Sequence, residues 1–146
     1  QVIEFSIIET RDELKEQEIT LTRELRYPNQ EVEGDSGLLV SCLVSLIRFA
    51  REHTELGGEI VVMTTMEQER PVCCLRDQGA GYSDTMFEVF EKHFSDGNAD
   101  LNLRMGIGLA LSQLIMEAHG GRLVFKRTDD QQGCIKMVFA ALDTQE

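Results

Sequence analysis

The chain has 146 residues, 42% of them hydrophobic, and a formal net charge of −12. This size predicts one globular domain over residues 1–146, and the acidic charge argues against a nucleic-acid partner, because binding a phosphate backbone requires clustered Lys and Arg. No apolar run approaches the ~20 residues of a membrane span, so we expect a cytoplasmic segment without direct membrane contact. The start at Gln1 favours a piece of a longer multidomain protein, whose other parts are free to carry a membrane anchor.

The first 37 residues predict two strands and a loop. The apolar, β-branched stretch VIEFSII (2–8) predicts a strand or the entry to one, and the charged stretch ETRDELKEQ (9–17) has weak helical spacing. In EITLTRELR (18–26), apolar and polar residues alternate, which predicts a half-buried strand. The Pro, Asn and Gly of YPNQEVEGDSG (27–37) predict a loop.

The next segment is an apolar helix that begins after a cap at Asp35 or Ser36 and runs to about Thr54. One polar stripe follows this helix at spacings i, i+4, i+7 and i+11, through Ser41, Ser45, Arg48 and Glu52. The stripe is either a solvated seam, with serines bonding back to i−4 carbonyls, or part of a site.

The second half alternates strands and helices. The patterns predict strands at 59–68 and 70–77, a helix at 85–94, a polar loop at 95–104, a glycine-flanked helix at 106–121, and strands at 122–128 and 134–142. This order predicts an α+β fold, a two-layer α/β sandwich with a mixed, mostly antiparallel sheet and helices on one face.

The four cysteines show no metal-binding spacing, and Cys73 and Cys74 point to opposite faces of their predicted strand. We therefore expect free, buried thiols in a reducing compartment.

Two glycine-bearing stretches are weak indications of a site when taken singly. DQGAG (77–81) places a carboxylate at a strand end before two glycines, and such Asp–Gly turns are common. GIGLALSQ (106–113) places two glycines before a helix, where free amides can bind an anion. It is neither a P-loop, since GK[ST] is absent, nor the dinucleotide fingerprint, since Leu111 stands where glycine is required.

Together, in this order and spacing, these stretches resemble the ATP-binding catalytic domain of bacterial sensor histidine kinases, in the ATPase fold family shared with DNA gyrase and the Hsp90 chaperones. CCLRDQGAGYSDTMFEVFEKHF resembles the family's strand, first glycine box and phenylalanine box. MGIGLALSQLIMEAHGGRLVFKR resembles its second glycine box, the following helix and the HGG turn, and GCIKMVFAAL resembles its closing strand. The resemblance covers nearly the whole chain.

The resemblance implies binding of ATP or ADP. Asp77 would accept a hydrogen bond from the adenine amino group, and Arg48 would pair with a phosphate. Gly79 and Gly81 would let the first loop pass close to the nucleotide. In the GxGL box, formed by Gly106, Gly108 and Leu109, backbone amides would face the phosphates. Residues 95–105 would form a lid over the phosphates, anchored by Phe87, Phe90 and Phe94.

Two departures from the family pattern bear on activity. The family's asparagine box, NLLxNAxxY/H, falls on residues 41–49, and Ser41 and Ser45 stand where its asparagines are expected. The second asparagine helps to hold Mg²⁺, so Ser45 occupies a metal-ligand position with a shorter oxygen-bearing side chain. Arg104 stands where glycine is frequent, and either stiffens the lid or supplies a cation in place of the metal.

Two functions follow from the resemblance. One is the catalytic half of a sensor histidine kinase, which donates the γ-phosphoryl of ATP to a histidine on a helical dimerisation domain of the same protein. The alternative is a degenerate pseudokinase that binds nucleotide weakly or without Mg²⁺ and acts through protein contacts. A response regulator or another signalling protein is the expected partner. The phosphoacceptor is expected outside this segment, because His53, His93 and His119 all lack the H-[ED]-x-x-[NT]-P context.

Overall fold

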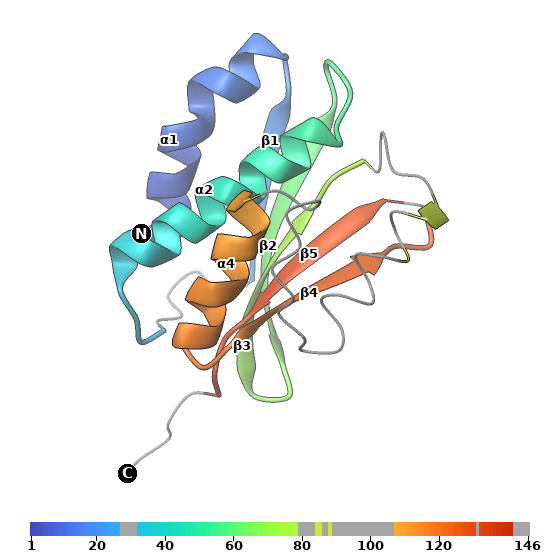
Figure 1. The fold of residues 1–146 in the computed structure, drawn as a ribbon. Coiled ribbons are helices and arrows are strands. Elements are labelled where there is room, and N and C mark those ends of the chain that lie inside the picture. The colour runs from blue at the N-terminus through green and yellow to red at the C-terminus, as the bar shows by residue number, and fades with distance from the viewer. Residues whose placement is uncertain (27–31, 79–83, 86–87, 89–106, 131, 142–146) are drawn as a thin grey trace.

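Figure 1 shows the computed structural model of the chain, which describes residues 1–26, 32–78, 84–85, 88, 107–130 and 132–141. The described elements, in chain order, are α1 (Val2–Glu16), β1 (Thr20–Leu25), α2 (Ser36–Glu52), β2 (Glu59–Glu67), β3 (Arg70–Arg76), α4 (Ile107–Ala118), β4 (Arg122–Arg127) and β5 (Gly133–Val138). The predicted strands from β1 to β5 and the helices α2 and α4 are thereby confirmed. The predicted phenylalanine-rich helix and the polar loop after it lie largely outside the described residues.

The sheet has five strands in the order β1-β2-β3-β5-β4. β1 and β2 are parallel, so the chain must cross over between them, and α2 makes that crossing. The remaining pairs are antiparallel. The helices α1, α2 and α4 lie on one face of this mixed sheet, which confirms the predicted two-layer α+β sandwich (Figure 1). No helix among the described residues is long and apolar enough to cross a membrane.

The core lies between the helices and the strands. Because side chains alternate along a strand, every second residue faces the helices, as Ile60 and Val62 do in β2 and Leu75 does in β3. α2 packs against both α1 and α4 and supplies the middle of the core, including the fully buried Leu46 and Ile47. Each such aliphatic side chain contributes about 1.5–3 kcal/mol through burial. The apolar side chains of α2 therefore serve the core, and only its polar stripe is available for a functional site.

The strand predicted at 2–8 is wrong, because these residues form the first half of α1. The buried positions Ile7, Thr10 and Leu14 recur at helical spacing, so the apolar stripe continues from the β-branched segment into the charged one. Helical periodicity over fifteen residues outweighs the local β propensity of a short apolar run. The hydroxyls of Ser6 and Thr10 bond back to the carbonyls of Val2 and Ser6, so they are satisfied inside the helix.

Asp35 is the N-cap of α2, which confirms one of the two predicted alternatives. His119 connects this cap to the end of α4. The Asp35 side chain accepts a hydrogen bond from the Leu38 amide at 3.0 Å. The Asp35 amide donates to Nε2 of His119 at 3.0 Å, so the proton of the imidazole sits on Nδ1, which donates to the Ile115 carbonyl at 2.7 Å. His119 thus joins the start of α2 to the last turn of α4.

The expectation of four free thiols is wrong for two of the cysteines. Cys74 in β3 and Cys134 in β5 form a disulfide, whereas Cys42 and Cys73 are free and buried. The strands β3 and β5 are neighbours only in the folded sheet, and the two cysteines are 60 residues apart in sequence. Spacing along the chain therefore gave no indication of the pairing.

Candidate functional site

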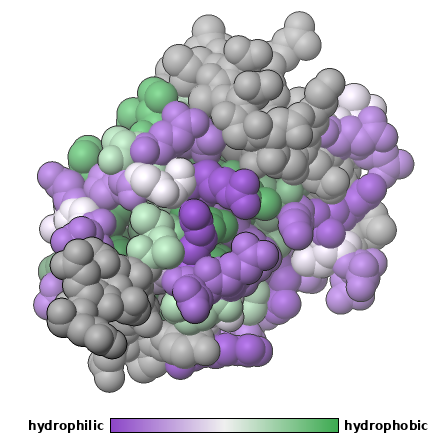
Figure 2. Space-filling view, turned by 90° about the horizontal axis from the view of Figure 1, so that it is seen from below, coloured by the Kyte–Doolittle hydropathy of each residue, from purple (hydrophilic) through white to green (hydrophobic). Residues whose placement is uncertain are grey.

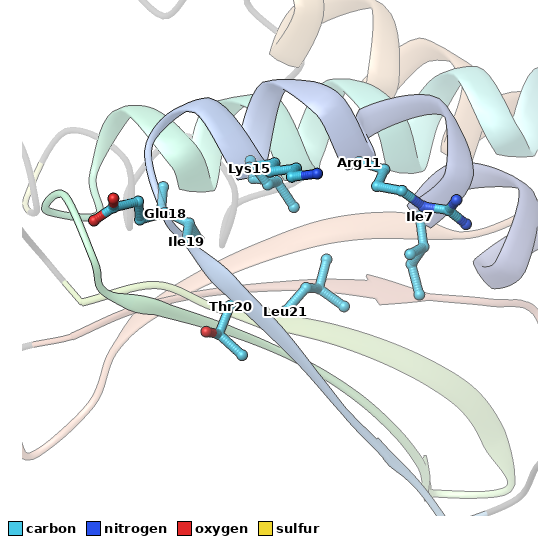
Figure 3. Close-up of a pocket in the computed structure, with 8 residues that line it drawn as sticks. Ile7, Arg11, Lys15, Glu18, Ile19, Thr20 and Leu21 are labelled. Carbon is cyan, nitrogen blue, oxygen red and sulfur yellow. The ribbon is translucent and has the colours of Figure 1, made fainter.

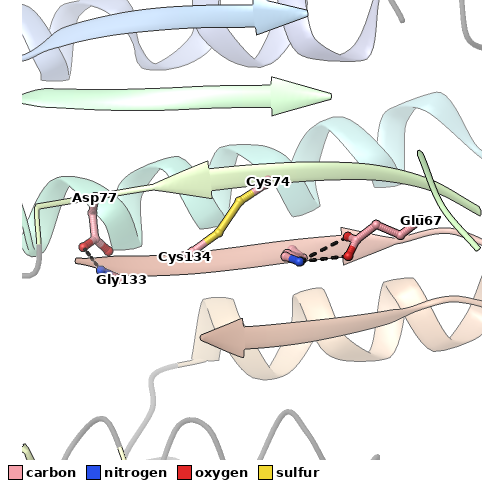
Figure 4. The surroundings of a disulfide bond; sticks show 6 residues. Glu67, Cys74, Asp77, Gly133 and Cys134 are labelled. Carbon is pink, nitrogen blue, oxygen red and sulfur yellow. Dashed lines mark hydrogen bonds and ion pairs between the residues drawn. A yellow bond between two sulfur atoms is a disulfide. The ribbon is translucent and has the colours of Figure 1, made fainter. Parts of the chain in front are cut away.

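Asp77 leaves the end of β3 and is fastened to the start of β5. Its backbone amide donates to the Gly133 carbonyl at 2.9 Å, and its Oδ1 accepts from the Gly133 amide at 3.0 Å (Figure 4). The residue is only 3% exposed, so the carboxylate depends on such partners in place of water. A carboxylate has about four acceptor sites. Asp77 is therefore a hydrogen-bond acceptor whose position is fixed by β5.

Ser45 and Gly108 meet where α2 crosses the first turn of α4. A β-carbon placed on Gly108 would lie 3.5 Å from Cβ and 3.6 Å from Oγ of Ser45, so the two helices approach closely. Ser112, one turn later in α4, donates its hydroxyl proton to the Gly108 carbonyl, 2.8 Å from Oγ, and the Cys42 carbonyl of α2 lies 3.4 Å from the same Oγ. The half-buried hydroxyl of Ser45 therefore lies beside the N-terminal turn of α4, where backbone amides favour an anion.

Arg48 is directed toward α1, where it binds Glu13. Its Nε donates to both carboxylate oxygens of Glu13 at 3.1 Å, and its terminal nitrogen donates to Oε1 at 2.7 Å. Arg51 adds a second cation 3.4 Å from the same carboxylate. The hydrogen bonds from Arg48, assisted by the charges of both arginines, lower the pKa of Glu13, and the same bonds raise the pKa of Arg48. In this structure the Arg48 guanidinium, which the sequence analysis expected to pair with a phosphate, binds the carboxylate of Glu13.

The other predicted site residues fall into two groups. Ser41 is exposed on α2, one turn before Ser45, and Leu109 is 3% exposed within the core. Four predicted residues lie outside the described part of the chain: Gly79, Gly81, Arg104 and Gly106. The phenylalanine box (Phe87, Phe90 and Phe94) and the proposed lid lie outside it too.

Sequence reasoning missed the partners that hold the site residues. The sequence placed Gly133 only between the strands predicted at 122–128 and 134–142, and its contact with Asp77 depends on the register of β3 against β5. Glu13 lies 35 residues before Arg48, and only the packing of α1 on α2 brings the two together. The glycine after the turn DDQQ is a sequence indication that could have drawn attention to Gly133, whereas nothing near Glu13 marks it.

A hollow on the surface lies among other residues. A groove of about 570 Å³ runs between α1 and the edge strand β1 (Figure 3). Its floor is apolar, with Ile7 and Leu21, and Arg11 and Lys15 stand on its α1 side. None of the predicted site residues lines it. Hydrophilic side chains cover much of the described surface seen from below (Figure 2), in keeping with the net charge.

The described residues do not by themselves form a metal site. Within the described ranges, no three His, Cys, Asp or Glu side chains gather where they could hold a metal ion. Ser45 offers one neutral hydroxyl, whereas Mg²⁺ takes six oxygen ligands and is usually held by one or two carboxylates together with substrate phosphates. The donor set at Ser45 therefore falls short of a protein-made magnesium site.

The sequence of the chain matches a known protein family. Residues 34–144 match the family described as histidine kinase-, DNA gyrase B-, and HSP90-like ATPase. The chain is 28% identical over 131 residues to the adaptive-response sensory kinase SasA of Rippkaea orientalis, covering 86% of this chain and 33% of that protein. It therefore spans about a third of that relative's length.

Two solved structures share the fold. The catalytic domain of histidine kinase ThkA superposes with a TM-score of 0.77 at 16% identity, covering 96% of this chain and 91% of that one. ThkA in complex with the response regulator protein TrrA superposes with a TM-score of 0.75 at 18% identity, covering 97% of this chain and 40% of that one.

Proposed function

The chain belongs to the histidine kinase-, DNA gyrase B-, and HSP90-like ATPase family, and from this premise we propose that it is the ATP-binding catalytic domain of a sensor histidine kinase. The single domain over residues 1–146 donates the γ-phosphoryl of ATP to a histidine on a separate helical dimerisation domain of the same protein. A response regulator then receives the phosphoryl group, and the complex of the related ThkA with TrrA supports a partner of that kind.

The observation that carries this proposal is the fixed carboxylate of Asp77. Gly133 holds the side chain against β5, so its orientation is set before a ligand arrives. The carboxylate then accepts a hydrogen bond from the exocyclic amino group of adenine, a contact with a charged acceptor that is worth about 1.5–3 kcal/mol. Guanine presents a carbonyl oxygen at that position, so the same contact selects ATP over GTP.

The phosphates are placed at the first turn of α4. Gly108 and its neighbouring amides donate there, and Ser45 adds a hydroxyl from α2. Gly79, Gly81, Gly106, Leu109, Ser41 and Arg104 complete this proposed site. Arg48 joins it by exchanging Glu13 for a phosphate, since a guanidinium binds both groups through the same forked donors. Magnesium supplies charge neutralisation to phosphoryl transfer when it is bound. The described donors do not by themselves make a site for it.

Titration calorimetry with ATP, once with Mg²⁺ and once with EDTA, tests the proposal. We expect binding of ATP, and a loss of affinity of about tenfold or more in Asp77→Asn, because the amide turns an N–H donor or a weaker acceptor toward adenine. Circular dichroism of the variant checks that it still folds. Unchanged affinity in Asp77→Asn would contradict the role of Asp77 as the adenine acceptor. Absence of ATP binding to the folded parent chain would contradict the proposed function as a whole.

A pseudokinase is the second candidate, and the replacement of both box asparagines by Ser41 and Ser45 favours it. In that function the domain binds nucleotide weakly or independently of Mg²⁺ and signals through protein contacts. Ser45→Asn separates the two candidates, because it restores the longer amide oxygen. Binding that is indifferent to Mg²⁺ in the parent chain and becomes Mg²⁺-dependent in Ser45→Asn supports the pseudokinase. Binding that already requires Mg²⁺ in the parent chain supports the active kinase.

A further inference from the structure

The disulfide and the Asp77–Gly133 contact connect the same two strands, within three residues of each other. Cys74 precedes Asp77 by three positions in β3, and Cys134 directly follows Gly133 in β5 (Figure 4). In the ladder, Cys74 pairs with Lys136 and Arg76 pairs with Cys134, so the disulfide joins the strands diagonally and passes over the one pair that lies between these two. The second of these pairs is the last before Asp77.

The Asp77–Gly133 contact forms the end of this ladder, so it depends on the strand pairs that precede it. Beyond Arg76 and Cys134, the strands stay together through two hydrogen bonds, Asp77 N–H to the Gly133 carbonyl and Gly133 N–H to Oδ1 of Asp77. Terminal pairs of a ladder open at low free-energy cost. A covalent link one pair inward limits how far the strands can separate, and so keeps the Gly133 amide opposite the Asp77 carboxylate.

The disulfide lies on the sheet face away from the helices. Cys73 and Leu75 belong to the core beneath the helices, so Cys74 between them points to the opposite face. Cys134, next to the core residue Ile135, points the same way. A reductant that reaches this bond therefore need not pass through the helical layer. The cysteines are 3% and 7% exposed, so the reductant reaches the bond only after the structure around it opens locally.

We propose that the Cys74–Cys134 pair is a redox-sensitive clamp on the nucleotide site. The disulfide form holds Asp77 against Gly133 and binds adenine nucleotide tightly, and reduction by a dithiol releases the strand ends and lowers that affinity. This inference rests on the proposed function, because it assigns the role of adenine acceptor to Asp77.

The reductive step is an ordinary thiol–disulfide exchange. A thiolate of the dithiol attacks one cysteine sulfur, the S–S bond breaks, and the other cysteine leaves as a thiolate that takes up a proton. The second thiol of the reductant then attacks the mixed disulfide and frees the first cysteine. Two electrons and two protons pass to the cysteine pair, and the reductant becomes a cyclic disulfide.

The test measures ADP and GDP affinities of the whole chain by calorimetry, in the oxidised form and after reduction with dithiothreitol. A thiol count by mass spectrometry establishes the state of each sample. We expect reduction to weaken ADP binding by about tenfold, the size of one compromised charged hydrogen bond. GDP binding should change less, so the ADP-to-GDP preference should fall. A role confined to stability would leave that preference unchanged.

Two variants control the experiment. The pair Cys74→Ser/Cys134→Ser should bind ADP like the reduced chain, whether or not dithiothreitol is present. Cys42→Ala removes a buried free thiol outside the clamp and should keep the full response to reduction. Equal ADP affinity and equal ADP-to-GDP preference in both redox states overturn the clamp and leave the proposed function standing. Absence of ADP binding in both states overturns the proposed function and the clamp with it.

Discussion

In the proposed site, a bound phosphate would compete with Glu13 for the guanidinium of Arg48. The carboxylate now takes three hydrogen bonds from Arg48, on the α1 side of α2. The pair is partly exposed, so it contributes little to stability, at most about 1 kcal/mol. A nucleotide that binds Arg48 would therefore have to replace only the small stabilisation from the Arg48–Glu13 ion pair.

We therefore predict that Glu13→Gln tightens ATP binding severalfold, because it removes the competing charge without shortening the side chain. Calorimetric titration measures the change. Glu16→Gln removes the same charge from the same helix at a residue that does not bind Arg48, and should leave the affinity close to that of the parent chain. Weaker or equal binding in Glu13→Gln would show that Arg48 serves α1 rather than a phosphate.

The two free cysteines are predicted to be chemically silent in the folded protein. Burial raises the pKa of the Cys42 thiol to about 11 and that of Cys73 to about 12, so thiolate is scarce at pH 8 in both. Iodoacetamide at pH 8, without reductant, should therefore label no cysteine in the native chain and two in urea, as counted by mass spectrometry. Rapid native labelling of either residue would contradict the packing of α2 on β3.

At the scale of elements, the contact between α2 and α4 is held at both ends. Ser45 and Gly108 meet near one end, and His119 binds the Asp35 amide at the other. His119→Ala removes the acceptor for that amide and the donor to Ile115. We expect it to lower the free energy of unfolding by about 0.5–1.5 kcal/mol, the net contribution of an ordinary hydrogen bond, because the exposed Asp35 amide can bind water instead.

Urea denaturation monitored by circular dichroism measures this loss. His119→Asn is the matched variant, since it keeps a short side chain with a donor and an acceptor, and it should lose less stability than His119→Ala. Equal losses in the two variants would mean that the hydrogen bonds of His119 contribute little and that only its volume matters.

The elements also show what the sequence could and could not specify. Alternation fixed β1 to β5, and the glycine boundaries fixed α4, because these patterns are local. The prediction for residues 2–8 was wrong because a short apolar run fits a strand or a helix equally well. Only Ile7, Thr10 and Leu14 together reveal the helical period. The contacts of Asp77 and Arg48 could not be predicted for another reason, because their partners Gly133 and Glu13 are distant in the chain.

At the scale of the whole molecule, the disulfide closes a loop of about 60 residues, from one central strand to another. In the chain-entropy account, a link of this span stabilises the folded state by about 4 kcal/mol. We predict that dithiothreitol lowers the free energy of unfolding in urea by up to that amount. Cys74→Ser/Cys134→Ser should unfold at the same urea concentration with and without reductant.

The family and fold followed from the order of three motifs across nearly the whole chain, and both are confirmed. The disulfide did not follow, because Cys74 and Cys134 sit in unremarked positions of two strands whose register only the folded sheet defines. Motif order is a property of the chain, whereas cross-strand proximity is a property of the sheet.

The strand order has a consequence for synthesis on the ribosome. β5 is the last described strand along the chain, yet it lies inside the sheet, between β3 and β4. Until it has left the exit tunnel, β3 and β4 have no shared partner, and their inner edges carry unpaired amides and carbonyls. The nascent domain therefore cannot complete its sheet step by step during translation, and its most exposed moment comes just before β5 is released.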